Sequence, residues 1–204
     1  MCNIEMRMIA IIDYNAGNVQ SVKYALERLG ASWILTDKKE EILKADKVLF
    51  PGQGEASTAM HHLRAKGLDE LIPKLTQPFL GICLGLQLLC KHSEENDTDC
   101  LGLFDINVKK FSSPIDGIKY KVPQMGWNTI ENLNSPLMEG IDNKSYVYFV
   151  HSYYAELSKY AISTTEYGCT YSSALQKDNF YACQFHPEKS SDVGQAILKN
   201  FLNL

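Results

Sequence analysis

Short apolar runs alternate with amphipathic segments through the first half of the chain, and this alternation most constrains the fold. Residues 8–12 are uniformly apolar, as expected for a strand that is buried on both faces. Val19, Val22, Leu26 and Leu29 then recur at helical spacing. We expect further strands at 33–35, 47–50 and 78–82, and helices at 38–44, from about 55 to 75, and at 84–92. A strand–helix alternation of this kind predicts a parallel sheet covered by helices on both faces.

The second half of the chain has a different pattern, in which short runs rich in Tyr and Thr are separated by turn residues. Such runs indicate strands, which we expect at 104–111, 122–130, 146–153, 160–165, 173–176 and 180–185, before a closing helix at about 193–202. With 204 residues, the chain is long enough for one full-sized domain and too short for two. We therefore predict one α/β domain over residues 1–204, with a central, mostly parallel sheet, flanking helices and an additional antiparallel or mixed portion in the second half.

Charge and composition narrow the classes of partner and compartment. The net charge is −4, which offers no basic surface for a nucleic acid or an anionic membrane. No apolar run reaches the roughly 18 residues of a membrane span or resembles a signal peptide. The six cysteines include no C-x-x-C pair, and no phosphate-binding glycine motif occurs, so neither a metal nor a cofactor is expected. We expect a cytoplasmic protein whose cysteines are free thiols.

The sharpest chemical signal is Gly-Ile-Cys-Leu-Gly at residues 81–85, between a predicted strand and a predicted helix. A nucleophile flanked by small residues at this junction is typical of a nucleophile elbow, here with Cys83 as the nucleophile. Gly81 and Gly85 suit the tight turn, because the nucleophile of an elbow has a strained backbone. The elbow would expose the thiol at the carboxyl end of the sheet and at a helix N-terminus, which favours the thiolate. The alternative is a buried structural cysteine beside two incidental glycines.

A thiolate nucleophile requires a base that is held by a third group. His186-Pro187-Glu188 follows the last predicted strand, and the proline favours an extended conformation for His186. In an extended segment residues i and i+2 share a face, so Glu188 could orient the imidazole. The tripeptide could equally be a surface turn.

A glycine-containing loop follows the strand that precedes the elbow strand. Its sequence is Pro-Gly-Gln-Gly at residues 51–54, and its glycines would allow a backbone N–H to approach a ligand closely. Together with the N–H of Leu84, this loop could form an oxyanion hole for acyl transfer. A plain connecting loop is the alternative.

These three segments resemble the three signatures of class I, or triad, glutamine amidotransferases in sequence, order and separation. Four further motifs are similar to those of the glutaminase subunits of imidazole glycerol phosphate synthase. They are Asp-Tyr-Asn-Ala-Gly-Asn at 13–18, Pro-Gln-Met-Gly-Trp-Asn at 123–128, Phe-Val-His-Ser-Tyr at 149–153 and His-Pro-Glu-Lys-Ser at 186–190. The resemblance covers nearly the whole chain.

The resemblance implies a flavodoxin-like fold and the hydrolysis of L-glutamine to glutamate through a γ-glutamyl thioester on Cys83. The ammonia would pass to a separate (βα)₈-barrel cyclase, the partner in a heterodimer, which makes imidazole glycerol phosphate and aminoimidazole carboxamide ribotide in histidine biosynthesis.

The resemblance also implies roles for individual residues. The triad would be Cys83, His186 and Glu188, and the oxyanion hole would lie at Gly52, Gln53 and Leu84. Glutamine would contact Gly52, Gln87, Glu95 and the backbone of His151, Ser152 and Tyr153. The cyclase would contact Asn15, Trp127, Tyr148 and Lys189.

Three other interpretations fit parts of the pattern. A paralogous amidotransferase could feed ammonia to another barrel synthase, for example in surface-sugar biosynthesis. A cysteine peptidase or γ-glutamyl hydrolase on the same scaffold would cleave its substrate without a partner. A non-catalytic binding module is disfavoured, because all three triad residues are present.

Overall fold

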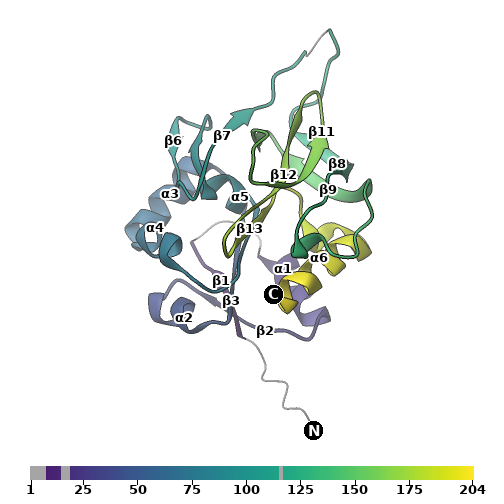
Figure 1. Ribbon diagram of the computed structural model, residues 1–204. Coiled ribbons are helices and arrows are strands. Elements are labelled where there is room, and N and C mark those ends of the chain that lie inside the picture. Colours follow the sequence, from purple (N-terminus) through teal and green to yellow (C-terminus); the bar gives the residue numbers. More distant parts are fainter. Residues whose placement is uncertain (1–7, 15–18, 115–116) are drawn as a thin grey trace.

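A seven-stranded sheet forms the centre of the computed structural model, which describes residues 8–14, 19–114 and 117–204 (Figure 1). Five of its strands are parallel and lie in the order β2-β1-β3-β4-β13, the order of flavodoxin-like sheets. They are β2 (Ser32–Thr36), β1 (Met8–Ile12), β3 (Lys47–Gly52), β4 (Phe79–Cys83) and β13 (Phe180–Cys183). Every residue of β3, β4 and β13 is buried, as the continuous apolar runs predicted.

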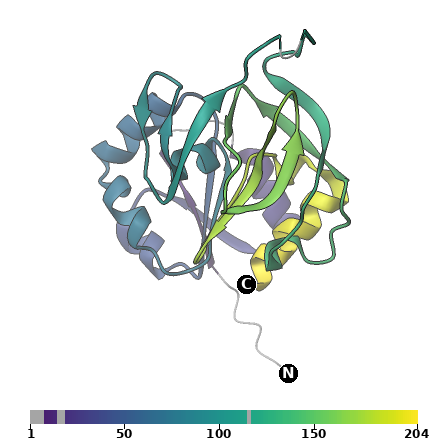
Figure 2. The same ribbon diagram turned by 45° about the horizontal axis from the view of Figure 1, so that its top comes forward.

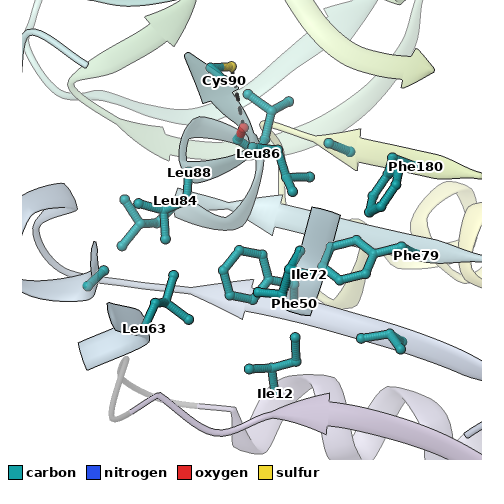
Figure 3. Packing of buried hydrophobic residues seen from close by; sticks show 14 of the residues in the cluster. Ile12, Phe50, Leu63, Ile72, Phe79, Leu84, Leu86, Leu88, Cys90 and Phe180 are labelled. Atoms are coloured by element: carbon teal, nitrogen blue, oxygen red, sulfur yellow. Dashed lines mark hydrogen bonds between the residues drawn. The ribbon is translucent and has the colours of Figure 1, made fainter. Parts of the chain in front are cut away.

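Helices cover both faces of this sheet (Figure 2). Alternate residues of β1 point to opposite faces: Ile9 and Ile11 pack with α1 (Gln20–Arg28) and α6 (Ser191–Asn203). On the other face, Ala10 and Ile12 pack in a second cluster with helices α2 to α5, part of which is drawn in Figure 3. These helices are α2 (Lys39–Lys44), α3 (Ala56–Ala65), α4 (Leu68–Leu71) and α5 (Leu84–Leu89), and a 3₁₀ turn, η1 (Ile72–Lys74), follows α4. The predicted layering is therefore confirmed.

The second half of the chain adds antiparallel strands, as predicted. Strands β11 (Ala161–Glu166) and β12 (Thr170–Lys177) extend the central sheet beyond β13. A separate four-stranded sheet has the order β10-β7-β5-β6, and a two-stranded ribbon joins β8 to β9. The bounds are β5 (Cys90–Ser93), β6 (Thr98–Asp99), β7 (Phe104–Lys110), β8 (Gln124–Ile130), β9 (Ser145–His151) and β10 (Tyr153–Ala155), with 3₁₀ turns η2 (Pro136–Met138) and η3 (Pro187–Lys189).

Three predicted elements differ from the structure. The helix expected from about 55 to 75 is divided into α3, α4 and η1, because Gly67, with φ of 61°, separates α3 from α4. The helix expected at 84–92 ends at Leu89, because Cys90 begins β5, which pairs in parallel with β7. The N–H groups of Leu101 and Gly102 donate to the carbonyls of Leu88 and Cys90, and these bonds complete the end of α5 in place of another helical turn. The strand expected at 146–153 is two strands, because the chain turns at Ser152, whose carbonyl accepts a hydrogen bond from Phe111.

Among the described residues, no helix is both long and apolar enough to cross a lipid bilayer.

Candidate active site

Cys83 lies at the sharp junction between β4 and α5. Its φ of 55° and ψ of −108° place it in a conformation that residues with a side chain rarely adopt. A Cβ at Gly85 would clash with the carbonyl oxygen of Phe50, and a Cβ at Gly81 would lie 2.9 Å from Leu89 Cδ1. The elbow conformation and its need for glycine at both flanking positions are therefore confirmed.

The Cys83 thiol opens onto a cavity of about 500 Å³ at the carboxyl ends of β3, β4 and β13. Only 8% of Cys83 is exposed, so the expectation of an exposed thiol was wrong. The cause is β9, which crosses above the elbow and brings the carbonyl oxygen of Val150 to 3.8 Å from Cys83 Sγ. The cavity therefore gives a ligand access to a sulfur that the surface of the described residues largely covers.

His186 lines the cavity, and Glu188 lies beside it on the segment that follows β13. The Nδ1 atom of His186 is 2.8 Å from Oε1 of Glu188, and only 3% and 4% of the two side chains are exposed. His186 is extended, as the following proline predicted, but Pro187–Lys189 forms the 3₁₀ turn η3. The shared face of His186 and Glu188 thus comes from a turn and not from an extended segment. The N–H of His186 also donates to the carbonyl of Tyr148 on β9, which fixes the backbone of the pair.

The surroundings of His186 favour its protonated form. Burial of the ring opposes a positive charge, but the charge and side-chain interactions with Cys83 and Glu188 together outweigh burial and raise the pKa of His186 to about 10. Within the described part of the chain, Nε2 of His186 and Oε2 of Glu188 are buried and have no hydrogen-bond partner. Glu188 contacts Nδ1 of His186, so Nε2 is the ring nitrogen that remains for Cys83. His186 and Cys83 line the same cavity.

The loop after β3 lies against the elbow. Gly52 is opposite Cys83 in the parallel pairing of β3 with β4, and Gln53 and Leu84 line the cavity beside the thiol. The space for a Cβ on Gly52 is occupied by the hydroxyl of Tyr14, which donates a 3.0 Å hydrogen bond to the carbonyl of Pro51. Position 52 therefore requires glycine, because the Tyr14 side chain packs against the loop there.

The other predicted substrate residues line the same cavity, namely Gln87, Glu95, His151, Ser152 and Tyr153. Gln87 donates from Nε2 to the carbonyl of Tyr153 at 2.9 Å. Glu95 accepts a 2.8 Å hydrogen bond from the N–H of Ala56, and partial burial raises its pKa. The structure thus brings together residues from five separate parts of the sequence.

Comparison with known proteins assigns the family. Residues 10–204 match the model of the family described as glutamine amidotransferase class-I. The chain belongs to this family. The protein named "Imidazole glycerol phosphate synthase subunit HisH" in Bacteroides thetaiotaomicron is 54% identical over 96% of this chain and 99% of its own length. The protein of the same name in Idiomarina loihiensis is 45% identical, and the match covers 96% of this chain and 97% of that protein.

Solved structures of more distant proteins share the fold of this amidotransferase. A structure described as a glutamine amidotransferase superposes with a TM-score of 0.72 at 20% identity, over 96% of this chain and 97% of that one. A glutamine amidotransferase from Thermotoga maritima gives a TM-score of 0.66 at 17% identity, over 98% of this chain and 84% of that one.

The predicted partner contacts gather on the β8–β9 side of the amidotransferase. Trp127 on β8 is 53% exposed, and its ring centroid is 6.0 Å from that of Tyr148, which lies opposite on β9. Tyr148 and Lys189 also line the cavity that holds Cys83. Trp127 and Lys189 further share a second hollow of about 410 Å³ with α1 and α6. Asn15 lies outside the described residues.

Several residues of the site were missed from the sequence. Gln184 is fully buried between Gln87 and Cys83, and its position two residues before His186 on an extended run was the signal that could have found it. The side chain of His151 was not predicted to matter: its Nδ1 is 2.8 Å from the carbonyl oxygen of Tyr153 and its Nε2 is 3.3 Å from the hydroxyl of Tyr171. Burial lowers the pKa of His151 to about 4, so the ring is neutral near pH 7.

Proposed function

We propose that this amidotransferase hydrolyses L-glutamine to glutamate and ammonia through a thioester on Cys83, and delivers the ammonia to a separate cyclase subunit. One observation supports the chemistry above all. At the edge of one cavity, a buried imidazole has Nδ1 held by a carboxylate and Nε2 unpartnered, and the strained thiol of the elbow opens onto the same space. The names of relatives at 45–54% identity support the place of the reaction in imidazole glycerol phosphate synthesis, and so in histidine biosynthesis.

The triad can carry out acyl transfer in two steps. At rest the proton of the Cys83 thiol lies on Nε2 of His186, whose raised pKa favours the imidazolium, and in the first step the thiolate attacks the carboxamide carbon of glutamine. His186 then returns that proton to the leaving nitrogen, so ammonia departs and a γ-glutamyl thioester remains. In the second step, His186 removes a proton from a water molecule that attacks the thioester. The carbon–sulfur bond then breaks, glutamate is released, and the Cys83 thiolate is left beside the protonated His186, as at the start. Glu188 keeps Nδ1 of the ring protonated and stabilises the imidazolium through the 2.8 Å contact.

Each step passes through a tetrahedral oxyanion that needs donors. We assign the N–H of Leu84 as the first donor, because it lies at the start of α5, where backbone N–H groups have no partner within the helix. We assign the N–H of Gln53 as the second, since Gln53 follows the strand residue opposite Cys83 and borders the same space. Gly54, with φ of +104° and no atom within 4 Å of a Cβ position, gives this loop room to reorient.

The cavity also suits the amino-acid end of glutamine. The carboxylate of Glu95 can accept hydrogen bonds from the α-ammonium group, and Gln87 and the His151–Tyr153 backbone provide further polar groups. Gln87 donates from its amide nitrogen to the Tyr153 carbonyl, which leaves its oxygen for the substrate. A volume of about 500 Å³ is ample for one amino acid.

A separate partner follows from the chemistry of ammonia. Ammonia released into water at neutral pH becomes ammonium, which is not a nucleophile, so hydrolysis without an acceptor site would waste glutamine. We propose that the acceptor is a (βα)₈-barrel cyclase that contacts Trp127, Tyr148 and Lys189, with Asn15 as a further predicted contact. We expect the heterodimer in the cytoplasm, where the nucleophilic thiol stays reduced.

A glutaminase assay with and without the barrel cyclase and its ribonucleotide ligand tests this proposal. We expect low turnover by the chain alone, strong stimulation by the liganded cyclase, and no turnover by Cys83→Ala in either case. Equal turnover with and without the cyclase would refute the coupling, and stimulation only by a different barrel synthase would assign another acceptor. Cleavage of peptides by the chain alone would instead support a peptidase.

A further inference from the structure

Gln184 is a buried amide that lies beside the nucleophile, and the steps proposed above do not use it. It follows β13, none of it is exposed, and its backbone N–H donates to the carbonyl of Ser173. Its Nε2 is 3.8 Å from Cys83 Sγ, and its Oε1 is 3.2 Å from Nε2 of Gln87. A polar side chain this deeply buried is costly unless its polar atoms have partners. Here one of the two partners is the reacting sulfur.

The direction of the Gln184 amide is fixed by its neighbours. The carbonyl of Tyr153 can only accept, so Gln87 must turn its NH₂ group toward it, at 2.9 Å. The second proton of that NH₂ group then points to Gln184, which must present its oxygen in return. The NH₂ group of Gln184 is therefore left facing the sulfur. This chain of amides, anchored at a backbone carbonyl, aims a donor at Cys83.

The other polar groups at the sulfur do not replace this donor. The carbonyl oxygen of Val150, at 3.8 Å, can accept a hydrogen bond from the neutral thiol but repels a thiolate. Helix α5 has only six residues, so the electrostatic contribution of its N-terminus is that of little more than one turn. Protonated His186 stabilises the thiolate as a positive charge beside the cavity, and the N–H of Gln184 adds a neutral donor that keeps its hydrogens when His186 passes its proton to the leaving nitrogen.

We infer that Gln184 is a further catalytic residue, whose amide N–H donates a hydrogen bond to the Cys83 thiolate and stabilises it before attack. The inference rests on the proposed function, since it gives the same sulfur the role of nucleophile. When the proton moves from the thiol to His186, the N–H group of Gln184 compensates part of the negative charge left on sulfur. Its oxygen meanwhile holds Gln87 in the substrate cavity, so one amide serves both the nucleophile and the pocket.

Alkylation of Cys83 by iodoacetamide tests this contact without glutamine, because the thiolate displaces iodide and the neutral thiol does not react. The rate is followed against pH on the Cys83 peptide by mass spectrometry, in the wild type and in Gln184→Met. Loss of one hydrogen bond to a charged group should slow alkylation at pH 7 by roughly tenfold and move the half-maximal rate to higher pH. At high pH the two rates should converge. Gln176→Met is the matched control. The Gln176 side chain on β12 bonds to Ser135 before η2 and to Tyr181 on β13, not to the sulfur, so this variant should leave the profile unchanged.

A second variant separates the contact from packing. Gln184→Glu keeps the shape and the acceptor for Gln87 but places an oxygen opposite the sulfur, so it should slow alkylation at pH 7 at least as much as Gln184→Met. In the complex with the cyclase, both variants should lower kcat by roughly tenfold and change KM less. Alkylation profiles of both variants that overlay the wild type, with unchanged melting temperatures, would overturn the role of Gln184. A wild type that hydrolyses no glutamine with its cyclase would contradict the proposed function, while the alkylation result would still report on the contact.

Discussion

Replacement of Glu188 by Gln tests the arrangement of the triad most informatively, because it changes one charge and almost no volume. Glu188 contacts His186 at 2.8 Å, and both side chains are at least 96% buried. The variant amide has two possible orientations. With its oxygen on Nδ1, its NH₂ group takes the place of Oε2, which is buried and has no partner among the described residues. With its NH₂ on Nδ1, the ring must protonate Nε2, and the base can no longer take the thiol proton.

Each orientation has a cost that can be estimated. A hydrogen bond to a charged group contributes about 1.5–3 kcal/mol, and a buried donor without a partner costs about 1–3 kcal/mol. Since each 1.4 kcal/mol corresponds to about tenfold in rate, kcat should fall by about 10- to 100-fold. KM should change little, because Glu188 is not placed against the substrate. The loss should remain smaller than that of Cys83→Ala, since the base is still present.

The assay is steady-state glutamine hydrolysis in the cyclase complex with its ribonucleotide ligand bound. Glu70→Gln on α4, an exposed carboxylate, is the matched control and should behave as the wild type. If Glu188→Gln kept a kcat within twofold of the wild type, Glu188 would not orient the base and the triad would have to be reassigned.

Three further predictions address the elbow, the cavity wall and the partner surface. Gly85→Ala should lower the free energy of unfolding by at least about 3 kcal/mol in urea titration, because its Cβ would clash with the carbonyl oxygen of Phe50 on β3. The control Gly102→Ala has open space for a Cβ, and its φ of 69° should cost only about 1–2 kcal/mol. His151 is neutral in the fold and charged in the unfolded chain between pH 4 and 6.5, so stability should fall on acidification through that window by up to about 3 kcal/mol, and His151→Gln should flatten the slope. Trp127→Ala should weaken cyclase binding in calorimetry by at least about 30-fold, and Leu43→Ala, similarly exposed on α2, should not. Equal losses for either matched pair, or an unchanged acid slope, would contradict the corresponding assignment.

Local sequence predicted the parts of this site that depend on neighbours along the chain. The glycines around Cys83 indicated the elbow because the tight turn lies within five residues, although the atom that excludes a Cβ at Gly85 is the carbonyl oxygen of Phe50 on β3. The alternation of strands and helices also predicted the parallel sheet, because the spacing of apolar residues that marks each element is a local property of the sequence. The pairing of His186 with Glu188 was also predicted, although the backbone between them is a 3₁₀ turn rather than extended.

The parts that were missed depend on contacts between distant segments. Cys83 is buried because Val150, 67 residues away, crosses above it, and no local pattern near Cys83 reveals this. Gln184 contacts Gln87 across 97 residues, and although its place two residues before His186 hints at the site, that place does not reveal this contact. The early end of α5 has a similar origin, since Cys90 pairs with Phe104 on β7. The packing of the whole fold determines such contacts, and the spacing of apolar residues along the sequence does not predict them.

The covalent intermediate on Cys83 is the central claim, and mass spectrometry of protein quenched in acid during glutamine turnover tests it most directly. The liganded cyclase complex should show the Cys83 peptide heavier by one glutamyl group, and the label should disappear once glutamine is exhausted. Turnover without any labelled Cys83 peptide, or with the label on another residue such as Cys100, would contradict the account.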